Sequence, residues 1–328
     1  MTIDETKWND MQTRLDGLRK EMATAVVGQH RILELMLTAL LCRGHCLIVG
    51  VPGLGKTLLV RTLGEVLGLS SHRIQFTPDL MPTDILGSEI LQTTDAGGRR
   101  FEFVEGPIFA NLILADEINR TPPKTQSALL EAMQEKQVTV AGQTRALQEP
   151  FIVYATQNPI EHEGTYPLPE AQLDRFFFDL QVDYPTMEEE QSILEQTTFE
   201  ETRKPRPVLS REQVLELQQA VRQVPIPDGV IQSILKLVHA TRPSSDQADD
   251  YVKQYVAWGA GPRASQTLSL AARALALLRG EPAASVQELV DLAMPVLRHR
   301  VIPNYNATGE GIGADDIVRH LLKAHGLA

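Results

Sequence analysis

The chain has 328 residues, 43% of them hydrophobic, which is enough to fill the cores of about two domains. Its 31 Lys and Arg against 42 Asp and Glu give a net charge of -11, which argues against a strongly basic nucleic-acid-binding protein. No apolar stretch reaches the roughly 18 to 20 residues of a membrane span, and the N-terminus lacks the features of a secretion signal. We therefore expect a cytoplasmic globular protein.

The first half of the chain alternates helical and strand patterns. Apolar residues at helical spacing predict two helices within residues 11–42, separated at Val26 to Gln29. Short apolar segments then predict buried strands at residues 46–49, 74–76, 112–115, 151–156 and 176–182. Longer polar or periodic stretches separate these segments, as in an α/β fold with a parallel sheet flanked by helices.

Two segments interrupt this alternation. Residues 89–93 and 100–104 flank a glycine-containing turn, and so do residues 137–140 and 143–147, so each pair predicts an inserted β-hairpin. Beyond Pro185 the pattern becomes helical, with periodic stretches at 214–221, 230–240, 265–278 and 286–296. We expect an α/β core at residues 1–184 and a smaller all-helical domain at residues 185–328.

The segment from Gly50 to Thr57 matches the phosphate-binding loop G-x-x-x-x-G-K-[ST] at every fixed position, between a predicted strand and a predicted helix. Its glycines let backbone N-H groups surround a polyphosphate, Lys56 supplies charge to the β and γ phosphates, and the Thr57 hydroxyl can ligate Mg²⁺. The predicted nucleotide contacts here are Gly50, Pro52, Gly53, Leu54, Gly55, Lys56, Thr57 and Leu58.

Polar side chains end two further predicted strands. Asp116 and Glu117 follow residues 112–115. We expect Asp116 to help hold Mg²⁺ from just outside its direct ligands, and Glu117 to orient and polarise the attacking water. Asn158 ends the strand at 151–156 and could reach the γ-phosphate, although by itself an Asn-Pro pair is more often only a turn.

Together these features resemble the AAA+ ATPases, and most closely their MoxR family. The segments that carry the resemblance are Val27-Gly28-Gln29, Gly106-Pro107-Ile108-Phe109, Ala115 to Arg120, Lys124 to Met133, Ala155 to Pro159, Pro169 to Phe176 and Pro262-Arg263-Ala264. Seen alone, Arg175 and Arg263 would pass as ordinary surface arginines. The likeness is dense up to residue 185 and looser in the helical region, where Gly261 stands in place of the Ser more often expected before Pro262-Arg263.

The resemblance assigns roles that spacing alone does not. It implies that Asn158 is sensor 1, that Arg175 is an arginine finger for a neighbouring subunit's γ-phosphate, and that Arg263 is sensor 2 over the protein's own nucleotide. Val27 and Gly28 would contact adenine. The two hairpins are similar to inserts that face the centre of a ring in this family.

The resemblance therefore implies an ATP hydrolase with ATP and Mg²⁺ as cofactors, acting as a homo-oligomer in a hexameric ring. Its work would be chaperone-like remodelling of protein clients, such as maturation of partner complexes or cofactor insertion. Clients with von Willebrand factor A domains are implied by the resemblance alone.

Two other functions share parts of this pattern. A nucleic-acid motor of helicase or branch-migration type has the same ATPase core, but the acidic charge balance argues against it, and we do not expect nucleic acid as a partner. A nucleotide-gated scaffold that hydrolyses ATP negligibly is disfavoured by the joint presence of Glu117, Asn158 and Arg175.

Overall fold

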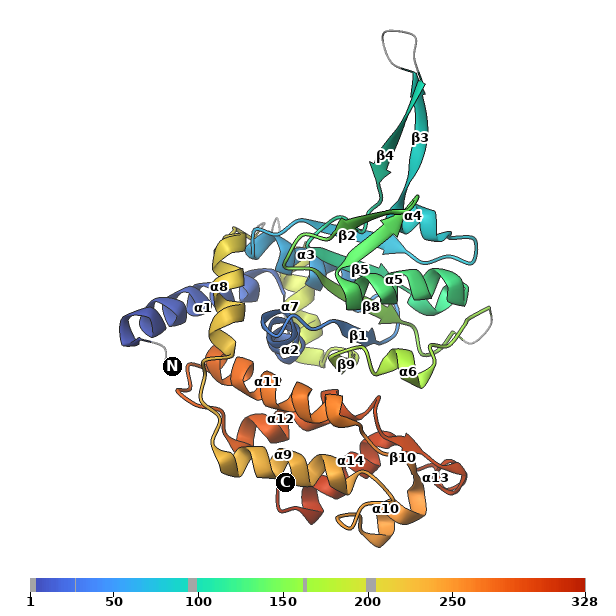
Figure 1. The fold of residues 1–328 in the computed structure, drawn as a ribbon. Coiled ribbons are helices and arrows are strands. Elements are labelled where there is room, and N and C mark those ends of the chain that lie inside the picture. The colour runs from blue at the N-terminus through green and yellow to red at the C-terminus, as the bar shows by residue number, and fades with distance from the viewer. Residues whose placement is uncertain (1–3, 27, 94–98, 162–163, 199–204, 328) are drawn as a thin grey trace.

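A sheet of five parallel strands, in the order β2-β5-β8-β1-β9, forms the centre of the core domain in the computed structural model (Figure 1). The structure describes residues 4–26, 28–93, 99–161, 164–198 and 205–327. The strands are β1 (Cys46–Val49), β2 (Ser71–Gln75), β5 (Leu112–Asp116), β8 (Ile152–Gln157) and β9 (Phe178–Gln181). The predicted parallel α/β core is confirmed, although β2 begins three residues before the apolar segment that indicated it.

Helices cover both faces of this sheet because alternate residues of its strands point in opposite directions. Leu112 and Leu114 of β5 join a buried cluster that includes residues of α1, α2 and α3, whereas Ile113 and Ala115 join one that includes α5. The core helices are α1 (Glu5–Ala25), α2 (His30–Leu41), α3 (Lys56–Val66), α4 (Pro82–Leu86), the 3-10 turn η1 (Ile118–Arg120), α5 (Pro123–Glu135) and α6 (Glu170–Leu173). A strand buried on both faces reads as a continuous apolar run, which is why the sequence signal was clear.

Both predicted hairpins are present. β3 (Gly87–Thr93) pairs with β4 (Arg99–Glu105), and β6 (Gln137–Val140) pairs with β7 (Gln143–Ala146), each antiparallel. The β3-β4 pair projects from the core as a long arm (Figure 1), and the turn at residues 94–98 lies outside the described residues. The arm is joined to the second hairpin by the guanidinium of Arg145, which stacks 3.9 Å from the ring centre of Phe103.

The second half of the chain is mainly helical, and its part from α9 onward lies below the core in Figure 1. Its elements are α7 (Met187–Thr198), α8 (Arg211–Val221), α9 (Asp228–Ala240), α10 (Asp250–Tyr255), β10 (Val256–Trp258), α11 (Pro262–Arg279), α12 (Val286–Leu297), β11 (Ile302–Pro303), α13 (Tyr305–Gly309) and α14 (Ala314–Ala324). The pair β10-β11 departs from the expected all-helical domain, because strands this short leave no periodic pattern. None of the described helices is both long and apolar enough to cross a membrane.

The domain division at residues 184 and 185 stays a prediction. Helix α8 lies beyond that boundary, yet Gln218 donates a hydrogen bond of 2.7 Å to the carbonyl of Leu40 in the core helix α2. We refer below to α9 through α14, together with β10 and β11, as the lid.

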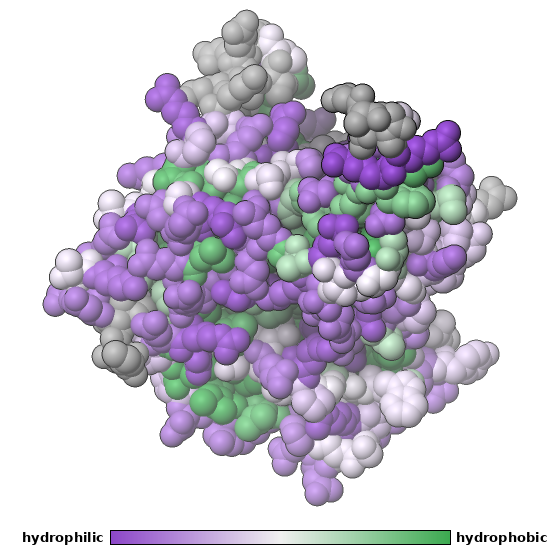
Figure 2. Space-filling model, turned by 45° about the horizontal axis from the view of Figure 1, so that its top comes forward, coloured by the Kyte–Doolittle hydropathy of each residue, from purple (hydrophilic) through white to green (hydrophobic). Residues whose placement is uncertain are grey.

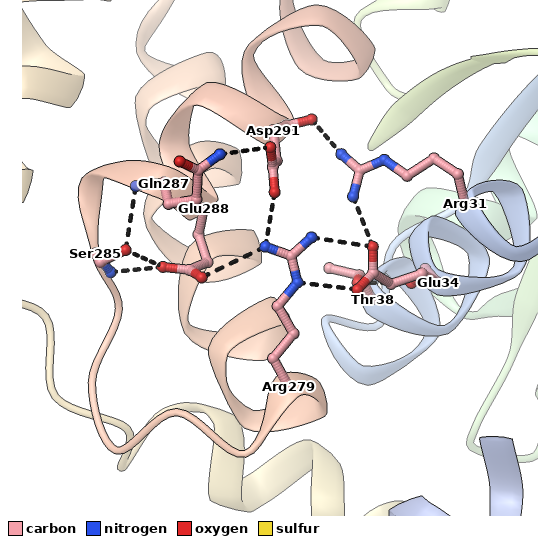
Figure 3. Close-up of polar contacts among 8 residues, drawn as sticks. All are labelled: Arg31, Glu34, Thr38, Arg279, Ser285, Gln287, Glu288 and Asp291. Carbon is pink, nitrogen blue, oxygen red and sulfur yellow. Dashed lines mark hydrogen bonds and ion pairs between the residues drawn. The ribbon is translucent and has the colours of Figure 1, made fainter.

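Charged side chains tie one end of the lid to the core (Figure 3). Arg279, at the end of α11, contacts both carboxylate oxygens of Glu34 on α2 at 3.0 and 3.2 Å. It also contacts Asp291 at 2.6 Å and the buried Glu288 at 3.5 Å, both on α12. Hydrogen bonds and ion pairs to Arg279 and Arg31 outweigh partial burial and lower the pKa of the Glu34 carboxyl. The Glu34 carboxylate therefore stays ionised at neutral pH, and its contacts with Arg279 fix the C-terminal end of α11 against α2.

Candidate active site

The fold brings the predicted phosphate loop and both predicted polar strand ends to one edge of the sheet. Strands β5, β8 and β1 are neighbours, and because they are parallel their carboxyl ends meet at the same edge. Asp116 ends β5, Asn158 follows β8, and the loop beginning at Gly50 follows β1. Ligands of open α/β sheets bind at this edge.

The phosphate loop is shaped for a ligand that approaches its backbone. Gly53 and Gly55 have φ angles of 87° and 73°, in the left-handed region, and open space surrounds the place where each would carry a Cβ. At Gly50 the reason for glycine is different, because a Cβ there would lie 2.6 Å from the carbonyl oxygen of Val182. Helix α3 begins at Lys56, so its N-terminal N-H groups face the loop.

The Lys56 ammonium is folded back onto the loop itself. It donates hydrogen bonds to the carbonyls of Gly50, at 2.5 Å, and Val51, at 3.3 Å. Partial burial lowers the pKa of Lys56, while the nearby carboxylates of Asp116 and Glu117 act in the opposite direction. The ammonium thus already lies among the loop carbonyls and the acidic pair, where a phosphate would meet it.

Asp116 is held by two neighbours. Its Oδ1 accepts a 2.6 Å hydrogen bond from the Thr156 hydroxyl on β8, and its Oδ2 lies 2.6 and 3.0 Å from Nη2 and Nε of Arg73 on β2. The Asp116 side chain is 14% exposed and that of Arg73 is 52% exposed, so the carboxylate is mostly buried while the guanidinium remains open to water. A cation binding beside Asp116 would meet the positive charge of Arg73.

Glu117 adopts a backbone conformation that is uncommon for a residue with a side chain, with φ 58° and ψ 50°. Its backbone N-H donates a 2.8 Å hydrogen bond to the Thr156 hydroxyl, and its Oε2 accepts a 2.8 Å hydrogen bond from the side-chain amide of Gln75 on β2. Arg120 lies 3.2 Å from the same oxygen. Such strain costs on the order of 1 to 3 kcal/mol and is typical of functional positions, and here it turns the carboxylate off the end of β5.

Asn158 has an amide N-H₂ group without a hydrogen-bond partner among the described residues. Its Oδ1 accepts a 3.3 Å hydrogen bond from the backbone of Ile160, but its buried Nδ2 has no hydrogen-bond partner among the described residues. An unsatisfied buried donor costs about 1 to 3 kcal/mol. Together with the open space at Gly53 and Gly55, this free donor shows that the residues present fit a nucleotide's phosphates.

The segment expected to contact adenine lies beside the phosphate loop. Gln29 donates a 3.0 Å hydrogen bond to the carbonyl of Leu54. Gly28 faces α7, where an added Cβ would lie 2.6 Å from a side-chain carbon of Glu189. Val27 lies outside the described residues, so its predicted contact stays a prediction.

Arg175 lies at the opposite edge of the sheet from this cluster. It precedes β9 at the amino end of that strand, while the phosphate loop follows the carboxyl end of the parallel strand β1, in which Cys46 pairs with Phe178. Four residues of strand separate these ends, or roughly 13 Å. Arg175 is exposed and forms no ion pair with any residue that the structure describes. It is therefore remote from the phosphate loop of its own chain.

Arg263 lies near Arg175, at the turn before β9. Its Nη1 contacts Oδ2 of Asp174 at 3.0 Å, and Arg263, Arg175 and Arg300 line one cavity of about 240 Å³. The expected role of Arg263 over its own chain's nucleotide stays a prediction. In this structure α11 meets the core with its N-terminus at the turn before β9, where Arg263 pairs with Asp174.

Residues that sequence reasoning missed complete the site. On β2, Arg73 pairs with the Asp116 carboxylate and Gln75 donates to the Glu117 carboxylate. On β8, the Thr156 hydroxyl joins the Asp116 carboxylate to the backbone N-H of Glu117. Gln75 ends β2 and lies opposite Asp116 in the register of β2 and β5, which only the structure shows. Thr156 lies within the segment Ala155 to Pro159 that carries the family resemblance, but its hydrogen bonds also appear only in the structure.

This sheet order, with a phosphate loop after β1 and an acidic pair at the end of β5, defines a P-loop protein of the AAA class. The family model described as "ATPase family associated with various cellular activities (AAA)" matches residues 45–178, and a model for the AAA lid domain matches residues 248–321. The chain is 44% identical to a Mycobacterium tuberculosis protein named Chaperone MoxR1, over 92% of this chain and 79% of that protein. The chain belongs to the MoxR family of AAA+ ATPases.

Two further comparisons agree with this assignment. The Paracoccus denitrificans protein MoxR is 30% identical over 93% of this chain and 92% of its own length. A crystal structure of a Cytophaga hutchinsonii protein superposes with a TM-score of 0.91 at 39% identity, covering 97% of this chain and 96% of that one. The likeness therefore includes the core and the lid together.

The bridge at Thr156 gives the first testable prediction. Thr156→Val should lower the stability of the fold by about 1 to 3 kcal/mol and also reduce kcat, because the Glu117 N-H and the Asp116 carboxylate both lose their buried partner. Thr156→Ser keeps the hydroxyl and should retain most of both. Thermal unfolding and phosphate release would be measured on the two variants side by side. Wild-type kcat in the Val variant would show that the bridge does not position Glu117.

Proposed function

We propose that this protein hydrolyses ATP with Mg²⁺ in a ring of identical subunits, six by resemblance, and uses the energy to remodel protein clients. One observation carries the proposal. The residues suited to bind phosphate and activate water lie at one edge of the sheet, and two arginines suited to stabilise phosphate charge lie at the other. One chain therefore carries two incomplete parts of an ATPase site, one at each edge of the sheet. A heterologous contact between two copies would join the first part of one copy to the second part of the other.

The residues of the carboxyl edge divide the work within one subunit. Lys56 and the N-H groups of the phosphate loop bind the phosphates, and the Asn158 amide donates to the γ-phosphate or its attacking water. Thr57 would ligate Mg²⁺, and Asp116 would help to hold the ion from just outside its direct ligands once its carboxylate is released from Arg73; the bound ion would neutralise phosphate charge. Glu117 orients the water and accepts its proton, once its carboxylate is free of Gln75 and Arg120.

The amino edge would complete a neighbour's site. Arg175 has an exposed guanidinium without an ion-pair partner among the described residues, as a group reserved for a neighbour's γ-phosphate needs to have. Arg263 lies on the same cavity, so we place it, too, at the neighbour's nucleotide.

The chaperone role follows from resemblance and from the projecting arm. The relative MoxR1 is named a chaperone. On the face drawn in Figure 2, hydrophobic residues form separate patches on a mainly hydrophilic surface. On the arm, Leu91 and Phe101 pair directly across β3 and β4 and are 52% and 70% exposed. Exposed apolar pairs of this kind suit binding to a protein client. Proteins with von Willebrand factor A domains remain the client class that the resemblance favours.

The arm gives a second prediction. The double variant Leu91→Ser and Phe101→Ser should weaken client binding, with basal ATP hydrolysis within a few-fold of wild type. Ile90 is 41% exposed on the other face of the same hairpin, so Ile90→Ser is the matched control. Pull-down of the client and phosphate release would be measured together. Unchanged client binding by the double variant would show that the arm does not bind the client.

The proposed function is tested by trapping the client. Glu117→Gln protein, incubated with ATP and a lysate of the source organism, should retain specific proteins that wild type releases, because its ring keeps ATP. Retention should be absent with ADP and with Lys56→Ala. Retention of DNA or RNA in place of protein would favour a nucleic-acid motor.

A further inference from the structure

A buried arginine of the lid holds the turn that carries Arg175. Arg300 follows α12, and its side chain is 2% exposed. Its Nε donates to Oδ1 of Asp174 at 2.8 Å, and its Nη2 donates to the carbonyl oxygens of Phe176 at 2.7 Å and Asp174 at 3.3 Å. Its Nη1 donates to the carbonyl oxygens of Phe177 at 3.4 Å and Val296 at 2.6 Å. Four of the five bonds therefore go to residues 174–177.

The neighbouring histidine adds to this attachment. His299 is also buried, and its Nε2 lies 3.1 Å from the carbonyl oxygen of Phe176. Burial, with the positive charge of Arg300 as a second cause, holds the pKa of His299 well below its usual range, so the ring is neutral and donates from Nε2. Two consecutive lid side chains thus bind the backbone on the C-terminal side of Arg175.

Arg175 itself depends on this attachment for its position. Its backbone N-H bonds to the carbonyl of Gln172, but its side chain has no ion-pair partner among the described residues. The lid holds Asp174 on one side of it and Phe176 on the other. Where the guanidinium of Arg175 can reach is therefore set by where the lid holds these two residues.

We propose that Arg300 is a positioning residue for catalysis in the adjoining subunit: from the lid, it fixes the turn at residues 174–177 so that Arg175 meets the neighbour's nucleotide. The inference rests on the proposed ring with Arg175 acting in trans. Because the same lid is bound to α2 through Arg279 at its other end, a shift of the lid in one subunit would move the arginine presented to the next.

The proposal predicts a defect that a neighbour can repair. Arg300→Gln should bind ATP with unchanged affinity but lose about 100-fold in kcat, the size of effect that a misplacement of about 1 Å produces. Its own Glu117 is intact. The Glu117→Gln variant has an intact turn at residues 174–177, so mixing the two variants should restore activity. In randomly mixed rings, about a quarter of the interfaces pair an intact Glu117 with an intact turn from the adjoining subunit. A variant that is merely misfolded would have a damaged site of its own and would not recover.

Matched variants make the result decisive. Arg298→Gln breaks the ion pair of Arg298 with Asp315 inside the lid, whose two N-to-O distances are 2.8 and 3.0 Å. Its kcat should stay within a few-fold of wild type. Arg300→Lys keeps the positive charge but loses the planar guanidinium that donates several hydrogen bonds at once. It should therefore also have a low kcat and also recover when mixed with Glu117→Gln. Native mass spectrometry would confirm that the rings are mixed.

Parallel mixing with Arg175→Ala separates two failures. If Arg175→Ala recovers with Glu117→Gln and Arg300→Gln does not, the positioning role of Arg300 is wrong and the ring proposal stands. Normal kcat in Arg300→Gln would overturn the positioning role as well. If neither mixture recovers, the trans-acting finger itself is wrong, and this inference fails with it.

Discussion

Glu117→Gln should bind ATP as tightly as wild type and lose turnover by about 10² to 10⁴, the usual contribution of a positioned general base. The change keeps the shape of the side chain and removes only the group that accepts a proton from water. Lys56→Ala should behave in the opposite way and lose tight ATP binding, because the ammonium beside Gly50 and Val51 is the loop's only side-chain cation.

The two variants are compared by titration with labelled ATP and by steady-state phosphate release. Glu117→Gln serves as the folding control for Lys56→Ala, since both alter one side chain at the same edge of the sheet. Equal ATP affinity in wild type and Lys56→Ala would contradict the site assignment.

Arg175→Ala should bind ATP normally and hydrolyse it slower by roughly 10³ to 10⁵, which is the contribution of an arginine finger in comparable phosphoryl-transfer enzymes. The loss has this size because the guanidinium meets charge that develops mainly in the transition state. The structure places Arg175 beyond reach of its own phosphate loop, so the defect should appear only in assembled rings.

Single-turnover phosphate release, at a protein concentration where wild type is assembled, would measure this effect. Arg206→Ala is a suitable charge control, because it removes an exposed arginine that lies outside the proposed site. Among the described residues, Arg206 forms a hydrogen bond only through its backbone N-H, to Glu21, so the substitution should leave that contact in place. A loss below ten-fold in Arg175→Ala would mean that this arginine does not act in the transition state.

The sequence predicted the carboxyl edge of the sheet well for a physical reason. A phosphate loop needs fixed glycines and a lysine at fixed spacing, and parallel strands place their polar ends together. Lys56, Asp116 and Asn158 could therefore be located from the amino-acid sequence alone. The backbone conformation of Glu117 could not, because it depends on a hydroxyl from β8 and an amide from β2 that approach only in three dimensions.

The amino edge was harder to predict because it depends on how the lid meets the core. The helical pattern at 265–278 lies next to Arg263, but which edge of the core that helix approaches depends on contacts between distant segments, such as the pair of Arg263 with Asp174 across 89 residues of chain. Arg300 carried no signal at all. A lone arginine after a helix is usually a surface residue, and only its burial against four carbonyl groups identifies it as part of the interface with the core.

Phosphate release per subunit, measured across a range of protein concentrations that spans assembly, tests the central claim most directly. The account predicts that specific activity rises with concentration and levels off as rings form, in step with sedimentation of the larger species in the presence of ATP. Specific activity that stays constant while the protein remains monomeric with ATP would contradict it.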